Sequence, residues 1–144
     1  MKKLLFATLS LVLSIASIEA QERIIEQSQL PKAAQSFLST YYPSDKVSVA
    51  TVERDGFDKD YSVLLVNGVK IEFDKNGDWM DVDCNKNYVP EPIVPTNIAK
   101  EVESRFPSCK IVKIERDKRY FEVELDNKVE LKFNNKGELI EVDN

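Results

Sequence analysis

The side chains of this sequence that could carry out chemistry are mainly carboxylates, because the chain has 25 acidic residues and no histidine. The lack of histidine excludes Ser-His and Cys-His nucleophiles, the commonest general base and imidazole metal ligands. A carboxylate-dependent hydrolase would need two acids in one pocket, with the pKa of one of them raised. Acids this numerous lie near one another in any fold. We therefore predict a protein that is not an enzyme and has no catalytic residue.

Cys84 and Cys109 are the only cysteines of the sequence. Two thiolates are too few for a closed zinc site. In an exported chain they could form a disulfide, which would close a loop of about 25 residues and stabilise the fold by roughly 3 kcal/mol. We predict this bridge, and the alternative is two separate thiols.

The segment Asp74–Asp78 has a weak similarity to a calcium-binding loop. Its glycine comes at the fourth position instead of the sixth, and the closing glutamate of an EF-hand is missing. A matching segment later in the chain, Asn134–Gly137, keeps the glycine but replaces the acidic residue with asparagine. A turn needs the glycine and a metal site needs the acids, so we predict a turn, no metal site and no cofactor.

The elements that position these residues are encoded twice, because residues 30–83 and 94–144 carry the same order of apolar, turn and aromatic positions. A copy of about 50 residues would be marginally stable alone, so we expect the two copies to share a sheet or to pack closely. Matching positions include Tyr42, Pro43, Val63, Leu65, Asn67 and Phe73, which correspond to Phe106, Pro107, Val123, Leu125, Asn127 and Phe133.

Each copy is predicted to begin with a helix that starts at or after a proline, over Pro31–Tyr42 and Thr96–Phe106. Ala34, Leu38 and Tyr42 recur at helical spacing and form an apolar stripe, which predicts the buried face. A proline directly follows each helix and ends it, because the residue before proline disfavours helical geometry.

Four strands are expected after each helix, since the apolar period changes from 3.6 to 2. Val69–Phe73 and Val129–Phe133 alternate apolar and charged residues, and the asparagines Asn67 and Asn127 predict tight turns before them. The fold class is therefore α+β, with a tandem repeat of a helix plus four antiparallel strands. The helices should pack on one face of a curved antiparallel sheet and leave the other face open.

The ends and the middle of the chain have other roles. Residues 1–20 combine two lysines with a short apolar run, which predicts a signal peptide and an exported protein without a later membrane span; an uncleaved anchor is the alternative. Residues 21–29 form an N-terminal segment, and the proline-rich residues 84–93 form a stiff linker. The formal net charge is −5, with lysines and acids interspersed, so nucleic acid is not an expected partner.

The repeated hairpins Val69–Gly77 and Val129–Gly137, with the signal peptide and the two proline-started helices, resemble the PepSY-like family of exported proteins. That family is also described as similar to the beta-lactamase inhibitory protein in fold. The resemblance covers essentially the whole chain after the signal peptide. It implies helices on one side of a curved sheet and a role in binding or inhibiting another exported protein. The matching residues belong to the scaffold, so the resemblance assigns no functional residue.

Surface apolar residues are the best candidates for a binding site. If Val63 and Leu65 face the helix, then Leu64 and Val66 face away, and strict alternation would also turn Trp79 outward. These residues would form an apolar patch on the open face, and a tryptophan there is a common binding anchor. The alternatives are that the N-terminal segment or the second copy covers the patch, or that a bulge turns Trp79 into the core. Two further candidates for the rim of the patch are Tyr88 and Tyr120.

The sequence thus predicts an exported, non-catalytic binding module that recognises another protein through the open face of its sheet. A small-ligand or calcium carrier is the alternative from another class, and it would require a defined cavity or metal-dependent melting.

Overall fold

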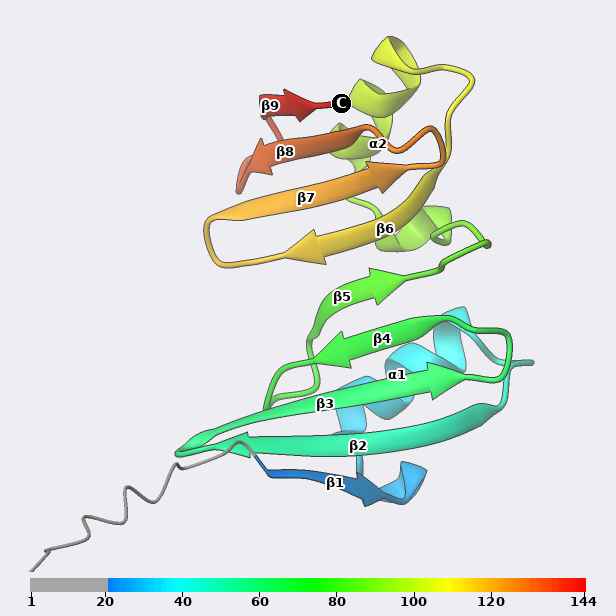
Figure 1. Cartoon of the computed structure of the whole chain (residues 1–144), viewed down its shortest axis with the longest axis vertical. Coiled ribbons are helices and arrows are strands. Elements are labelled where there is room, and N and C mark those ends of the chain that lie inside the picture. The colour runs from blue at the N-terminus through cyan, green and yellow to red at the C-terminus, as the bar shows by residue number, and fades with distance from the viewer. Residues whose placement is uncertain (1–20) are drawn as a thin grey trace, which may run out of the picture.

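The computed structural model describes residues 21–144, so the predicted signal peptide lies outside the described residues. Two α-helices and a nine-stranded antiparallel sheet make up the fold, which confirms the α+β class (Figure 1). The strands follow one another in the sheet in the order of the sequence. Their bounds are β1 Gln21–Ile25, β2 Val47–Asp55, β3 Asp58–Leu65, β4 Lys70–Phe73, β5 Trp79–Asp83, β6 Ile111–Arg116, β7 Tyr120–Leu125, β8 Glu130–Asn134 and β9 Leu139–Asp143.

The helices α1 (Lys32–Tyr41) and α2 (Thr96–Arg105) lie within a residue of their predicted bounds. Pro31 and Pro95 occupy the N-cap positions, and each helix ends two residues before the following proline, with Tyr42 and Phe106 as the C-caps. Both helices lie behind the sheet in Figure 1, so within residues 21–144 the opposite face carries no α-helix. We call this opposite face the outer face.

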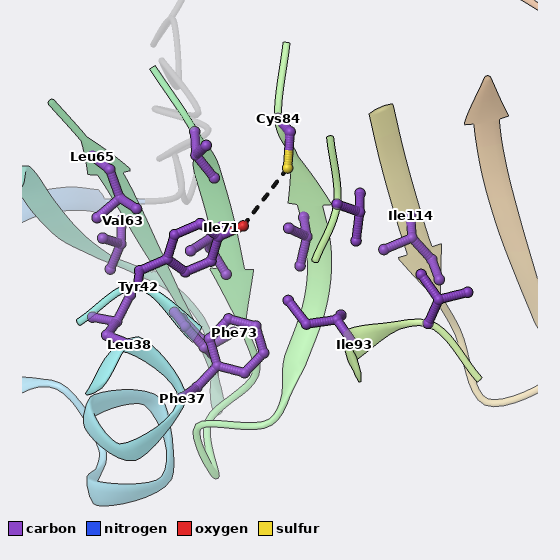
Figure 2. Packing of buried hydrophobic residues seen from close by; sticks show 14 of the residues in the cluster. Phe37, Leu38, Tyr42, Val63, Leu65, Ile71, Phe73, Cys84, Ile93 and Ile114 are labelled. Atoms are coloured by element: carbon purple, nitrogen blue, oxygen red, sulfur yellow. Dashed lines mark hydrogen bonds between the residues drawn. The ribbon is translucent and has the colours of Figure 1, made fainter. Parts of the chain in front are cut away.

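One hydrophobic core lies between the helices and the inner face of the sheet. Phe37 of α1 meets Phe73 of β4 edge to face at 5.5 Å, and Phe73 is fully buried. The core continues past β5 to Ile93 and Ile114 in the second half of the chain (Figure 2). Both halves of the chain therefore contribute to the same core.

The turns between strands follow the predicted chemistry. The Asn67 side chain accepts a hydrogen bond from the Val69 amide at 3.0 Å, and Asn127 does the same for Val129 at 3.1 Å. Gly77 has a φ of +85° and lies directly against α1, where a Cβ atom would come within 2.8 Å of the Ala34 nitrogen. The turn therefore requires glycine both for its backbone conformation and for its close packing.

Two segments, residues 21–29 and 84–93, have structural roles that were not predicted from the sequence. The N-terminal segment forms β1, which pairs with β2 and places Ile24 opposite Thr51, so it extends the sheet instead of covering the outer face. The linker folds back on β6, since the Val89 amide donates to the Ile111 carbonyl at 2.9 Å. Val89 is thereby buried, which makes the linker part of the core as well as a connector.

Candidate binding surface

The outer face carries charged side chains on most of its strands, because inward apolar residues alternate with outward polar ones. Glu72, Asp81, Glu115 and Glu122 lie on four neighbouring strands, β4 to β7, and each is paired with the next across the strands. We call these residues the acidic row. Like charges directly opposite each other destabilise a sheet, so the acidic row lowers the stability of the folded protein.

Lysines flank the acidic row without interrupting it. Lys70 lies 3.2 Å from Glu72, Lys113 lies 3.5 Å from Asp81, and Lys132 lies 3.7 Å from Glu122. These partly exposed ion pairs offset only part of the repulsion, since such pairs contribute about 0 to 1 kcal/mol each. The centre of the outer face therefore keeps a local excess of negative charge.

Asp81 is the most buried carboxylate of the row, with a side chain that is 14% exposed. Burial raises its pKa to about 6, Lys113 opposes the change, and Glu115 and Glu72 add to it. Within the described part of the chain, its Oδ1 atom is buried and has no hydrogen-bond partner. The protein thus keeps a carboxylate on this face that its own side chains do not fully satisfy.

Lys113 is the basic partner of this carboxylate. Burial lowers its pKa, but the carboxylates of Asp81, Glu115 and Asp83 outweigh burial and raise it overall. The lysine faces several anions, whereas Asp81 faces two anions and this one cation. The ammonium is therefore well stabilised, and the carboxylates around it are not fully neutralised.

The predicted apolar patch is only partly formed. Leu64 and Val66 are exposed as expected, at 38% and 70%. Trp79 does not face outward, which corrects the prediction, because a bulge in the pairing of β4 with β5 places it opposite the buried Phe73. Directly opposite residues share a face, so Trp79 lies on the helix side of the sheet and packs against the core.

Trp79 lines an open cleft of about 940 Å³ at the end of the sheet where three turns meet. The Arg116 guanidinium lies 4.2 Å from the centre of its ring, and Arg116 Nε donates to the Trp79 carbonyl at 2.6 Å. Cation–π stacking and this hydrogen bond hold the two residues together. Charged residues of both signs make up most of the remaining wall: Asp58, Lys59, Asp60, Asp74, Lys75, Asp78, Asp117, Lys118 and Arg119.

Neither of the two tyrosine candidates lines this cleft. Tyr120 on β7 has the Lys132 ammonium 4.5 Å from its ring centre. Tyr88 in the linker is half-exposed and has the Lys110 ammonium 4.8 Å from its ring centre. The five apolar and aromatic candidates therefore do not form one site.

The two cysteines are free thiols in the structure, which contradicts the predicted disulfide. Cys84 is buried in the core and its sulfur lies 3.7 Å from the Tyr42 hydroxyl (Figure 2). Burial raises the pKa of Cys84, while its hydrogen bond with Tyr42 lowers it in part. Cys109 is only half-buried and lines a separate hollow beside α2. The Cys84 side chain thus packs toward α1 and the first half of the core.

The segment Asp74–Asp78 is a turn, as predicted. Asp74 Oδ1 accepts hydrogen bonds from the amides of Asn76 and Asp78 at 2.8 and 3.0 Å. Asn134 accepts the same two bonds in the second half with an uncharged side chain. The carboxylate therefore serves the backbone of the turn.

Residues 21–144 contain no cluster of three or more acidic, cysteine or histidine side chains placed to hold a metal ion. Within the same residues, no helix is long and apolar enough to span a membrane.

Sequence reasoning missed the acidic row and the pairing of Arg116 with Trp79. The alternation of acids in Asp81–Asp83 and Glu122–Glu124 was a signal for outward carboxylates, but which strands lie side by side depends on the sheet order. It also missed Phe57, a fully exposed side chain at the tip of the β2–β3 hairpin.

Comparisons with known proteins agree with this architecture. A family model described as "Putative beta-lactamase-inhibitor-like, PepSY-like" matches residues 16–63 and 59–141. No curated protein matches the chain.

Two solved structures from Bacteroides are 44% identical to this chain. The first, from Bacteroides vulgatus, is a "putative periplasmic protein from DUF2874 family", with a TM-score of 0.84 over 86% of this chain and 98% of that chain. The second, from Bacteroides thetaiotaomicron, is a "putative calcium-regulated periplasmic protein", with a TM-score of 0.83 over 85% of this chain and 97% of that chain.

A third structure, also from Bacteroides vulgatus, is a "putative periplasmic protein of unknown function". It is 28% identical, with a TM-score of 0.82 over 86% of this chain and 100% of that chain. The similarity to all three spans nearly their full length. This chain is an exported protein and belongs to the PepSY-like family.

Proposed function

We propose that the protein is an exported, non-catalytic module that binds a basic surface of another exported protein through the acidic row of its outer face. The observation that carries this proposal is the side-by-side placement of Glu72, Asp81, Glu115 and Glu122 on four neighbouring strands. Such a row costs folding free energy in the free protein and would be neutralised by a cationic partner.

Two properties of the outer face support protein binding over catalysis. The described helices lie on the other side of the sheet, so the row is open to a large partner. The hollow along Lys113, Glu115 and Glu122 has a volume of only about 60 Å³, which is too small for a substrate pocket. The family's description as beta-lactamase-inhibitor-like makes exported enzymes one class of partner to test.

We also infer that residues 30–83 and 94–144 are two copies of one unit, joined by residues 84–93. Support comes from the strand registers, because Val63 pairs with Ile71 as Val123 pairs with Leu131. Bulges also interrupt β4–β5 and β8–β9 at equivalent places. The acidic row crosses from β5 to β6, so it exists only where the two copies meet.

The test is photo-crosslinking in the native extracytoplasmic compartment. A crosslinking residue at Ser62, which lies opposite Glu72 on the outer face, should capture a partner that a crosslinker at Lys100 on α2 does not capture. The triple variant Glu72→Gln, Glu115→Gln and Glu122→Gln should lose this capture, as should raised salt.

The matched control removes three acids from the helix side: Glu91→Gln, Glu101→Gln and Glu103→Gln. This variant should capture the partner as the parent does. Capture that survives neutralisation of the row, or that is lost equally in the control, would contradict the proposal.

Calcium binding is the second candidate function, because one 44% identical structure is described as calcium-regulated. The unpartnered Oδ1 of Asp81 is the feature of this chain that favours it. The described residues hold no preformed metal cluster, so calcium would have to bridge carboxylates of the row. If it does, calcium should raise the melting temperature of the parent more than magnesium does, and should not do so for the triple variant. An equal change in melting temperature with calcium and with magnesium would exclude this function.

A further inference from the structure

The strands β5 and β9 have similar sequences but different surroundings. β5 carries Asp81-Val82-Asp83 and β9 carries Glu141-Val142-Asp143. Val82 is fully buried because β6 pairs with β5 on its other side, whereas Val142 is 44% exposed. Within residues 21–144, β9 pairs with β8 and forms one edge of the sheet (Figure 1).

The β5–β6 seam shows which kind of strand fits beside this sequence. Ile114 of β6 lies opposite Val82 on the inner side, and Lys113 lies opposite Asp83 on the outer side. The Lys113 ammonium is also 3.5 Å from an Asp81 carboxylate oxygen. The other outward residue of β6, Glu115, lies opposite Asp81 and repeats its charge. A strand that alternates apolar and basic residues would therefore complement both faces of such a sequence better than β6 does.

A second copy of this chain would fit the β9 edge poorly. Two antiparallel β9 strands would bring the outward Glu141 and Asp143 of both copies together, and like charges at such a seam are unfavourable. The opposite edge, β1, carries Glu22 on the outer side and also lacks an outward basic residue there. The charges thus favour a basic strand from another protein.

We propose that the free edge of β9 binds an extended segment of another protein by antiparallel strand addition. The segment places an apolar side chain against Val142 and a lysine or arginine against Asp143, with main-chain hydrogen bonds along the edge. This site lies on the edge of the sheet and goes beyond the proposed binding through the acidic row. It stands or fails independently of that row.

The probe is a labelled synthetic peptide of residues 110–117 of this chain, which contains β6. Its binding to the purified protein is measured by fluorescence anisotropy. We expect saturable binding that weakens about tenfold when the peptide carries Lys113→Glu. Binding should strengthen when the peptide carries Glu115→Lys, since that position of the bound peptide would lie opposite Glu141.

Variants of the protein locate the binding edge. Val142→Lys should weaken binding of the peptide about tenfold, because a charge on an edge strand blocks pairing. The matched control is Ile24→Lys at the β1 edge, which should bind as the parent does. Glu141→Gln with Asp143→Asn, which does not disturb the apolar side, should weaken binding and reduce its salt dependence.

Three results would overturn the proposal. They are no binding of the peptide, binding unaffected by Val142→Lys and by the Glu141 and Asp143 changes, or a dimer in sedimentation experiments that Val142→Lys dissociates. The last result would assign the edge to a second copy of the chain. The triple glutamine variant of the acidic row should bind the peptide like the parent, which separates this test from that of the outer face.

Discussion

Asp81 is the residue of the acidic row whose ionisation is most strongly affected by its surroundings. It combines burial, two carboxylate neighbours and an unpartnered oxygen with only one cationic partner. The folded protein therefore binds a proton at Asp81 more tightly than the unfolded chain does. A protein that retains such a group gives up stability at neutral pH, which fits a residue that serves a surface for binding.

The pH dependence of stability should reveal this cost. The folded pKa of Asp81 is about 6, above the ordinary value of 3.8. The extra stability from proton binding is fully present below about pH 4 and is lost as pH rises through 6. Asp81→Asn should raise the free energy of unfolding at pH 7 by about 2 to 3 kcal/mol, and this advantage should vanish near pH 4.

Denaturant unfolding of both proteins between pH 4 and 7 measures the difference. An advantage of the variant that does not depend on pH would show that Asp81 does not titrate in this range.

The accessibility of the two thiols gives a second test at the residue scale. Cys84 is fully buried and burial raises its pKa, whereas Cys109 is half-buried. Iodoacetamide should alkylate Cys109 in the folded protein and both cysteines after unfolding, because the thiolate at an accessible site reacts. Mass spectrometry after each treatment counts the modified thiols. If the unfolded protein resists alkylation until a reductant is added, the two cysteines are joined in a disulfide and are not free thiols.

At the scale of elements, turns and bulges decide where side chains point. Because of the bulge between β4 and β5, Trp79 lies on the helix side of the sheet and not on the outer face, where strict alternation would place it. The turns that precede β5 and β9 are fixed by Gly77 and Gly137, which pack against α1 and α2. Each turn thus ties one helix to the sheet.

Replacing these glycines tests that role. Gly77→Ala should destabilise the protein by more than about 2 kcal/mol, because its Cβ would clash with backbone of α1 in addition to the left-handed φ. Gly68→Ala is the control, since Gly68 has a φ of +92° but no atom within 4 Å of the added Cβ. It should cost only about 1 kcal/mol. Thermal melting compares the two, and equal losses would mean that contact with α1 is unimportant.

For the whole molecule, the pairing of β5 with β6 joins the two halves into one sheet above one core. Ile114 lies on this seam and is fully buried. A continuous sheet also carries the acidic row across the junction. The halves should therefore be stable only together.

The unfolding transition checks this dependence. Fluorescence of Trp79, the single tryptophan, and far-UV circular dichroism should give coincident transitions in denaturant. Ile114→Ala should lower the free energy of unfolding by about 2 to 5 kcal/mol and keep the two probes coincident. Ile140→Ala at an exposed position should change it by less than about 0.5 kcal/mol. Two separate transitions would instead show independent halves.

The sequence by itself determined the two helices and the four strands that follow each of them, with most of their inward residues, but not β1. Prolines before and after the helices, the apolar period and the asparagine and glycine turns are local signals, so α1, α2 and the paired hairpins could be predicted from them. The absence of histidine likewise restricted the chemistry without any structure.

Only the tertiary structure decided which side chains meet. The bulge that turns Trp79 inward interrupts the alternation of inward and outward residues. The position of this bulge could not be predicted from the pattern of apolar and polar residues. The acidic row depends on β5 lying beside β6, and the contact of Arg116 with Trp79 joins residues far apart in the sequence. Burial of Cys84 against Tyr42 is long-range in the same way. Such contacts follow from how whole elements pack, because packing of the shared core fixes the register and order of the strands.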